Sequence, residues 1–189
     1  MGDIKSAWEI AQERANRLGK FSAEEQKQRK EQECRQIAAG LAQDYLDFSK
    51  TQDITTMLDK HFGEEKSLEE KSLIESALFS LLTEAITFDS RGRAEKAARG
   101  VVTLEPKAQP IVGRMMDLLA EYHQAGERIR KGVESKVKEV LHQLRISGSA
   151  IGEINIEGSP QQQQDLQRFR APLEQQLDAL KRDLHEGKF

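Results

Sequence analysis

The side chains best suited to chemistry are few and lie far apart in the chain. Cys34 is the only cysteine, and it falls on an apolar stripe with Ile37 and Leu41, where no neighbouring base would activate a thiolate. This spacing predicts a buried thiol that packs as a small apolar side chain. A single cysteine also excludes an intramolecular disulfide and a zinc site built on several cysteines.

The remaining polar residues do not have the spacing of a metal or phosphate site. Four histidines occur with no pair at metal-ligand spacing: His61, His123, His142 and His185. An acidic group precedes and begins a predicted helix, without the alternating oxygen ligands of a calcium loop: Glu64, Glu65, Glu69 and Glu70. Residues 90–100 contain glycines and arginines but lack the glycine spacing of a phosphate loop. We therefore predict no catalytic residue, no metal site and no cofactor, in a protein that is not an enzyme and binds no small molecule.

One helical segment is locally basic. It carries six cations, namely Arg128, Arg130, Lys131, Lys136, Lys138 and Arg145, and three acids, namely Glu127, Glu134 and Glu139. Cations along a rod can follow a phosphate backbone and make the affinity steeply dependent on salt. No aromatic side chains are interleaved with them for base stacking. Nucleic-acid contact through the first five cations is one hypothesis, and an ordinary solvated helix surface is the other.

A second candidate surface is the apolar stretch that follows this helix. It places four isoleucines among three glycines: Ile146, Ile151, Ile154 and Ile156. One interpretation is a loop, with a short strand at Ile154 and Ile156 as a variant, whose isoleucines fold back onto the helices. The other is an apolar tip that contacts a protein partner.

The composition favours an elongated, charged protein. Hydrophobic residues make up 37% and charged residues 32% of the 189 positions, which is lean for a compact globule. The 29 basic and 32 acidic residues nearly balance, so net charge favours neither nucleic acid nor a membrane. Residues 1–10 lack the apolar core expected of a signal peptide, and no window of the sequence approaches 18 apolar residues. We predict a cytoplasmic protein.

Apolar periodicity and caps predict helices throughout the N-terminal part. The first helix is expected at 4–18, and the second is opened by Ser22 and Glu25 and continues to Phe48. The other three are expected at 54–62, 68–88 and 91–102. Ser67 with Glu70 has the form of a capping box, and the segment from Leu68 to Phe88 is apolar on most faces, which predicts the central helix of a bundle. The helix at 91–102 is expected to have a basic outer face. Two prolines within 103–110 mark a break.

The last 80 residues predict two long helices that pair. The first runs from Pro106 to about Arg145 and would be roughly 57 Å long, and the second runs from Pro160 to about His185. Their apolar seams share an 11-residue period, which predicts nearly straight antiparallel packing and not a left-handed coiled coil. The sequence leaves open whether this hairpin packs on the bundle or stands free.

Two stretches resemble known families. The run AGERIRKGVESKVKEVLHQLRI at 125–146, followed by a linker and a leucine-rich last helix, resembles the two C-terminal helices of ribosome recycling factor. That resemblance implies contact with ribosomal RNA through Arg128, Arg130 and Lys131, although residues 31–105 predict helices where that family has a β-rich domain. The opening IKSAWEIAQER at 4–14 resembles bacterial helical proteins of uncharacterised function, and it implies no activity.

Taken together, the sequence predicts an all-α protein. Residues 1–106 would form a small helical bundle, and residues 107–189 a long antiparallel helical hairpin with a connector at 146–159. The expected function is non-enzymatic protein–protein interaction, as a scaffold or adaptor that binds another protein or a second copy of itself. The alternative is an RNA- or ribosome-associated factor that uses the basic face of the long helix.

Overall fold

The computed structural model describes residues 23–47, 53–62, 67–144 and 160–187. These residues form six α helices and one 3-10 helix, and no strand occurs among them. The helices are α2 (Ala23–Asp47), α3 (Ile54–Phe62), α4 (Leu68–Glu84), α5 (Arg91–Leu104), η1 (Pro106–Ala108), α6 (Gln109–Gln143) and α7 (Pro160–His185). The all-α prediction is confirmed. The predicted helix at 4–18, the cap at Ser22 and the connector at 146–159 lie outside the described residues.

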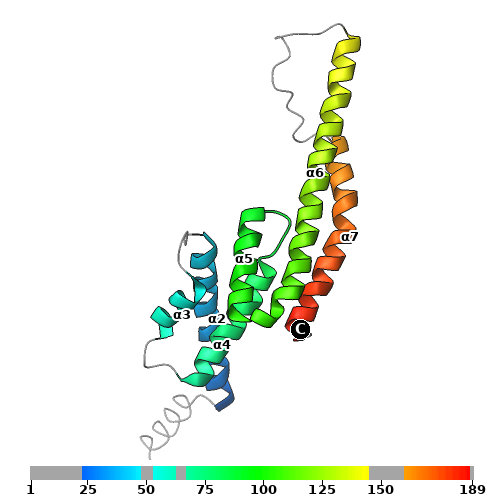
Figure 1. Ribbon diagram of the computed structural model, residues 1–189. Coiled ribbons are helices and arrows are strands. Elements are labelled where there is room, and N and C mark those ends of the chain that lie inside the picture. Colours follow the sequence, from blue (N-terminus) through cyan, green and yellow to red (C-terminus); the bar gives the residue numbers. More distant parts are fainter. Residues whose placement is uncertain (1–22, 48–52, 63–66, 145–159, 188–189) are drawn as a thin grey trace, which may run out of the picture.

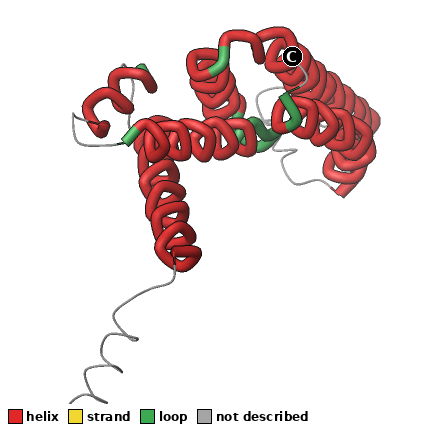
Figure 2. Tube along the Cα trace, turned by 90° about the horizontal axis from the view of Figure 1, so that it is seen from below, coloured by secondary structure: helices red, strands yellow, loops and turns green. Residues whose placement is uncertain are grey.

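Helix α4 is the centre of the bundle. It contacts α2, α5 and α7, while α3 and the α6–α7 pair lie on opposite sides of it (Figures 1 and 2). Its buried face carries Ile74, Leu78 and Leu82, all fully buried. The expected central position of this helix is therefore confirmed.

The N-terminus of α4 is held by the predicted capping box. The Glu70 backbone N–H donates to Ser67 Oγ at 3.3 Å, and the Ser67 N–H donates to Glu70 Oε2 at 3.4 Å. The bond from the Ser67 backbone is the main reason that the pKa of Glu70 lies below its ordinary value, with Lys30 at 3.5 Å contributing. Two donors left unpaired by the first turn are thereby satisfied.

Two details of α4 differ from the prediction. The helix ends at Glu84 and not at Phe88, because the Ile86 N–H turns back to the Thr83 carbonyl oxygen at 3.2 Å. Although α4 lies among its neighbours, they also leave part of its apolar surface uncovered. Leucines at three positions are exposed by 85%, 41% and 37%: Leu68, Leu73 and Leu81.

Helix α5 docks on the C-terminal end of α2 through its basic side chains. Lys96 Nζ donates to the Leu46 carbonyl oxygen at 3.1 Å, the Tyr45 hydroxyl donates to the Lys96 carbonyl oxygen at 3.2 Å, and Arg93 pairs with Asp47. Cations at a helix C-terminus are favourable because the last carbonyl groups lack partners. The basic outer face expected for this helix thus serves in part to hold α2.

Gly100 permits the close packing of α5 against its neighbours. A Cβ at this position would lie 2.8 Å from Leu82 Cδ1 and 3.0 Å from Tyr45 Cε1. Both of those side chains are buried. The absence of a side chain at Gly100 therefore sets the distance of α5 from α4 and α2.

The last two helices form the predicted antiparallel hairpin (Figure 1). The expected start at Pro106 is confirmed, although the first turn is the 3-10 helix η1 and α6 proper begins at Gln109. Helix α7 spans Pro160–His185 as predicted, and it contains Pro172 in its interior, a position that donates no backbone hydrogen bond.

The base of the hairpin packs on the bundle, and one continuous buried cluster joins the two. From the hairpin the cluster includes Met115, Leu119, Leu177 and Leu184. Lys181 of α7 is only 8% exposed, and its ammonium donates to the Glu84 carbonyl oxygen at 3.1 Å. The return helix is therefore attached to the end of α4 by both apolar and polar contacts.

Candidate functional site

The far end of α6 extends beyond its partner helix. Leu166 of α7 lies 3.6 Å from the Cβ position of Gly126. The helices are antiparallel, so six residues back along α7 correspond to six residues forward along α6. Pro160 is therefore level with about Gly132. The remaining 11 residues of α6, about 16 Å of helix, have no described helix beside them. Figure 1 shows α6 continuing past the start of α7.

This free end continues the apolar seam of the hairpin. We call four of its apolar residues the distal row: Val133, Val137, Val140 and Leu144. They follow one another at steps of four, three and four, so they lie on one side of the helix. Val133 and Val137 are half-buried, whereas Val140 is 53% and Leu144 65% exposed. Among the described residues, none covers Val140 and Leu144 as α7 covers the seam lower down.

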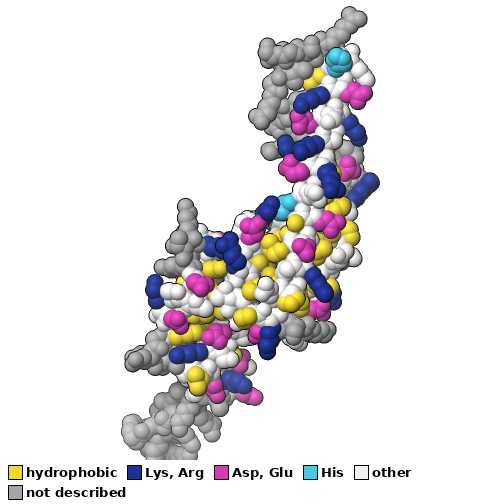
Figure 3. All heavy atoms as spheres, in the orientation of Figure 1, with side chains coloured by type: hydrophobic (Ala, Val, Ile, Leu, Met, Phe, Trp, Pro, Cys, Tyr) yellow, Lys and Arg dark blue, Asp and Glu magenta, His cyan; other side chains and the backbone are white. Residues whose placement is uncertain are grey.

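The predicted basic residues surround this row but do not form a single face. At 3.6 residues per turn, Arg128, Lys131 and Lys138 fall on the side opposite the row, and Arg130 and Lys136 lie toward its two edges. All five are exposed. Figure 3 accordingly shows basic and acidic side chains alternating along the upper part of α6.

Two of these cations are paired within the helix. Arg130 lies 3.0 Å from Glu127, and Lys138 lies 2.6 Å from Glu134. In each case the hydrogen bond from the cation is the main reason that the pKa of the glutamate lies below its ordinary value. Intrahelical pairs of this kind stabilise a helix slightly and reduce the charge offered to a phosphate backbone.

The four isoleucines predicted as partner contacts, Ile146, Ile151, Ile154 and Ile156, lie outside the described residues. That prediction stays a prediction.

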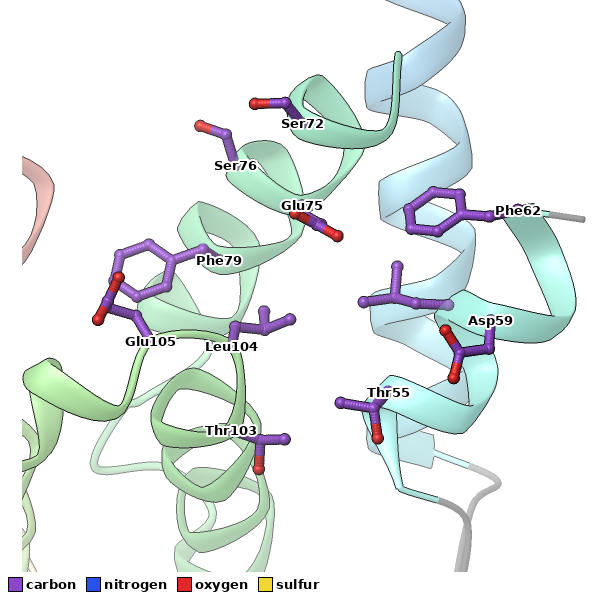
Figure 4. Close-up of a pocket in the computed structure, with 11 residues that line it drawn as sticks. Thr55, Asp59, Phe62, Ser72, Glu75, Ser76, Phe79, Thr103, Leu104 and Glu105 are labelled. Atoms are coloured by element: carbon purple, nitrogen blue, oxygen red, sulfur yellow. The ribbon is translucent and has the colours of Figure 1, made fainter. Parts of the chain in front are cut away.

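A cleft of about 460 Å³ opens between α3, α4 and the end of α5. We call it the acidic cleft. Four apolar side chains line it, Leu58, Phe62, Phe79 and Leu104, together with seven polar ones, Thr55, Asp59, Ser72, Glu75, Ser76, Thr103 and Glu105. Figure 4 shows Glu75 pointing from α4, and Asp59 from α3, into the space between the two helices.

The described residues that line the acidic cleft carry only negative charge. They include three carboxylates, and no lysine, arginine or histidine is among them. Glu105 Oε1 accepts a hydrogen bond from the Lys107 N–H at 3.2 Å, whereas Asp59 and Glu75 have no ion-pair or hydrogen-bond partner in the described part of the chain. The Lys71 ammonium lies 5.6 Å from the centre of the Phe62 ring, but Lys71 is not among the residues that line the cleft.

Sequence reasoning did not find this cleft, because its walls come from three separate helices. Each acid is unremarkable on its own helix, and only the packing of α3 and α5 beside α4 brings them together. The one local signal is Glu105, an acid directly before a proline at the break between α5 and η1.

The residues considered for catalysis and metal binding stay apart. Cys34 is buried in the core at 5% exposure, which confirms its predicted packing role. Within the described ranges, no three His, Cys, Asp or Glu side chains come together as metal ligands. No described helix has the length and apolar character needed to cross a bilayer.

Comparisons of the chain with protein-family models, with curated proteins and with solved structures find no match. The resemblances at 4–14 and 125–146 therefore stay predictions.

Proposed function

We propose that this protein is a non-enzymatic scaffold or adaptor whose hairpin binds another protein chain through the distal row of α6. The observation that carries the proposal is the exposure of Val140 and Leu144, at 53% and 65%, in line with the seam that α7 covers lower down. Exposed apolar side chains that continue a packed seam are a typical protein contact surface.

The form of the row indicates the kind of surface that it fits. Apolar residues at steps of three and four match a second helix or a shallow apolar cleft. Complete burial of one valine or leucine contributes about 1.5–3 kcal/mol, so two such side chains support a weak to moderate association. Lys136 and Arg130 at the edges favour a partner with acidic residues there.

Charge changes in the distal row test the proposal. We expect Val140→Lys with Leu144→Lys to abolish association, measured as mass by light scattering and as partners retained from native extract by mass spectrometry. Ser135→Lys is the matched control, because Ser135 is exposed on the opposite side of the same helix. The proposal is wrong if the double variant and the control both behave as the wild type, or if the wild type is monomeric and retains nothing.

A second candidate function is binding to RNA or the ribosome. It is supported by Arg128, Lys131 and Lys138, which share the side of α6 opposite the distal row. In this case co-sedimentation with ribosomes falls steeply as salt increases, and Arg128→Glu with Lys131→Glu removes it. Association that neither salt nor these substitutions change would exclude this candidate.

A further inference from the structure

We infer that the distal end of α6 of one copy binds in the acidic cleft of a second copy, so that copies associate head to tail. This inference rests on the proposed function, which gives the distal row a protein partner, and it names that partner as the α3–α4–α5 region of the same protein. The occupant of the cleft is then a helix end that is itself described in the structure.

Opposite charges favour this pairing. Residues 127–143 of α6 carry five cations and three acids, a net charge of +2, whereas the described lining of the acidic cleft has three acids and no cation. Pairing two α6 ends with each other would bring like charges together, which is unfavourable. Lys136 has no ion-pair partner among the described residues, and neither do Asp59 and Glu75.

The apolar parts also correspond. The row presents Val140 and Leu144, and the cleft is lined by two phenylalanines and two leucines, Leu58, Phe62, Phe79 and Leu104. A volume of about 460 Å³ is small, and it accommodates a few side chains and not a whole helix. The expected contact is therefore the helix end, with its apolar residues inside the cleft and Lys136 near the carboxylates.

The positions of the two surfaces determine the kind of assembly. Figure 1 shows one end of α6 pointing away from the bundle, and α3 lying across α4 from the hairpin. The distal row is on that end of α6, and residues of α3 line the cleft. Two different surfaces on one molecule produce a heterologous interface, which leaves one surface of each kind unoccupied unless a ring closes. Mass is then expected to rise with concentration past that of a dimer.

Mixing two variants tests this inference directly. The cleft variant is Asp59→Lys with Glu75→Lys, and the row variant is Lys136→Glu with Val140→Glu; all four positions are exposed. Each variant alone is expected to have the monomer mass of 21.4 kDa in light scattering at all concentrations. An equal mixture is expected to give twice that mass, because the cleft variant retains a normal row and the row variant retains a normal cleft.

Control variants make each outcome decisive. Glu33→Lys with Asp44→Lys reverses two exposed charges on α2, away from the cleft, and is expected to associate as the wild type does. Circular dichroism confirms that every variant is helical. The inference is overturned if the wild type is monomeric at millimolar concentration, or if the mixture of variants stays monomeric. It is also overturned, with the proposed function intact, if the row variant loses association and the cleft variant keeps it.

Discussion

Gly100 offers a sharp test of how the bundle is packed, through the single substitution Gly100→Ala. The added Cβ would lie 2.8 Å from Leu82 Cδ1, at least about 0.7 Å closer than the 3.5–4.0 Å at which carbon atoms attract each other most strongly. The same Cβ would lie 3.0 Å from Tyr45 Cε1. Because Leu82 and Tyr45 are themselves buried, neither side chain can move aside without disturbing the core.

Two effects of opposite sign determine the magnitude. Replacing glycine by alanine inside a helix stabilises it by about 1 kcal/mol, while extra methyl groups in a packed core cost about 1–3 kcal/mol. With two contacts this short we expect the upper half of that range, and a net loss of about 1–2 kcal/mol in the free energy of unfolding. Gly40→Ala is the matched control, since a Cβ at Gly40 meets no atom within 4 Å, and it should gain up to about 1 kcal/mol.

The assay is urea unfolding of both variants and the wild type, followed by circular dichroism. The urea midpoint should decrease for Gly100→Ala and increase for Gly40→Ala. The slope of the free energy of unfolding against urea concentration should be similar for both variants and the wild type. The difference between the two variants cancels the helix propensity and isolates the cost of overpacking. Equal stabilisation by both substitutions would refute the reasoning and would show that α5 can move away from α4 at little cost.

Two other predictions concern polar groups in and around α4. Thr83 is fully buried, and its hydroxyl has no hydrogen-bond partner among the described residues. Thr83→Val replaces the hydroxyl with a methyl group of similar size and should raise the free energy of unfolding in urea by about 1 kcal/mol or more. A lower free energy of unfolding would mean that the hydroxyl is satisfied. The pKa of Glu70 is lower in the folded protein, so its ionised form contributes stability that is fully present above the unfolded value of 4.5 and is lost as pH falls through the lower folded value. Thermal unfolding should therefore show Glu70→Gln less stable than wild type at pH 7, with the difference shrinking below about pH 4; a difference independent of pH would contradict this assignment.

Local sequence signals were enough to predict most of the helices. Ser67 with Glu70 marked the start of α4, and Pro160 with the leucine spacing marked α7. In both cases the signal depends on residues within one or two turns, so the physics that it reflects is present in the sequence segment itself. The hairpin followed because long apolar seams on consecutive helices must be covered.

Features that depend on the relative placement of helices were not predicted. The exposure of Leu73 and Leu81 depends on which side of α4 its neighbours occupy, and the sequence of α4 alone favours burial of every leucine. The acidic cleft is a similar case, since Asp59, Glu75 and Glu105 are separated by 16 and 30 residues. The role of Gly100 is a third case, because it depends on how close α5 lies to Leu82 and Tyr45.

The contact of Lys181 with Glu84 has a consequence for how the chain folds during synthesis. The two residues are 97 positions apart, and the last helix also supplies Leu177 and Leu184 to the buried cluster. A ribosome adds about 5–20 residues per second, so the bundle waits roughly 5–20 s after α4 is made before α7 can cover it. During that interval the α4 side of the cluster is accessible to chaperones and to other nascent chains, and the completed fold depends on residues that are translated well after the helix they cover.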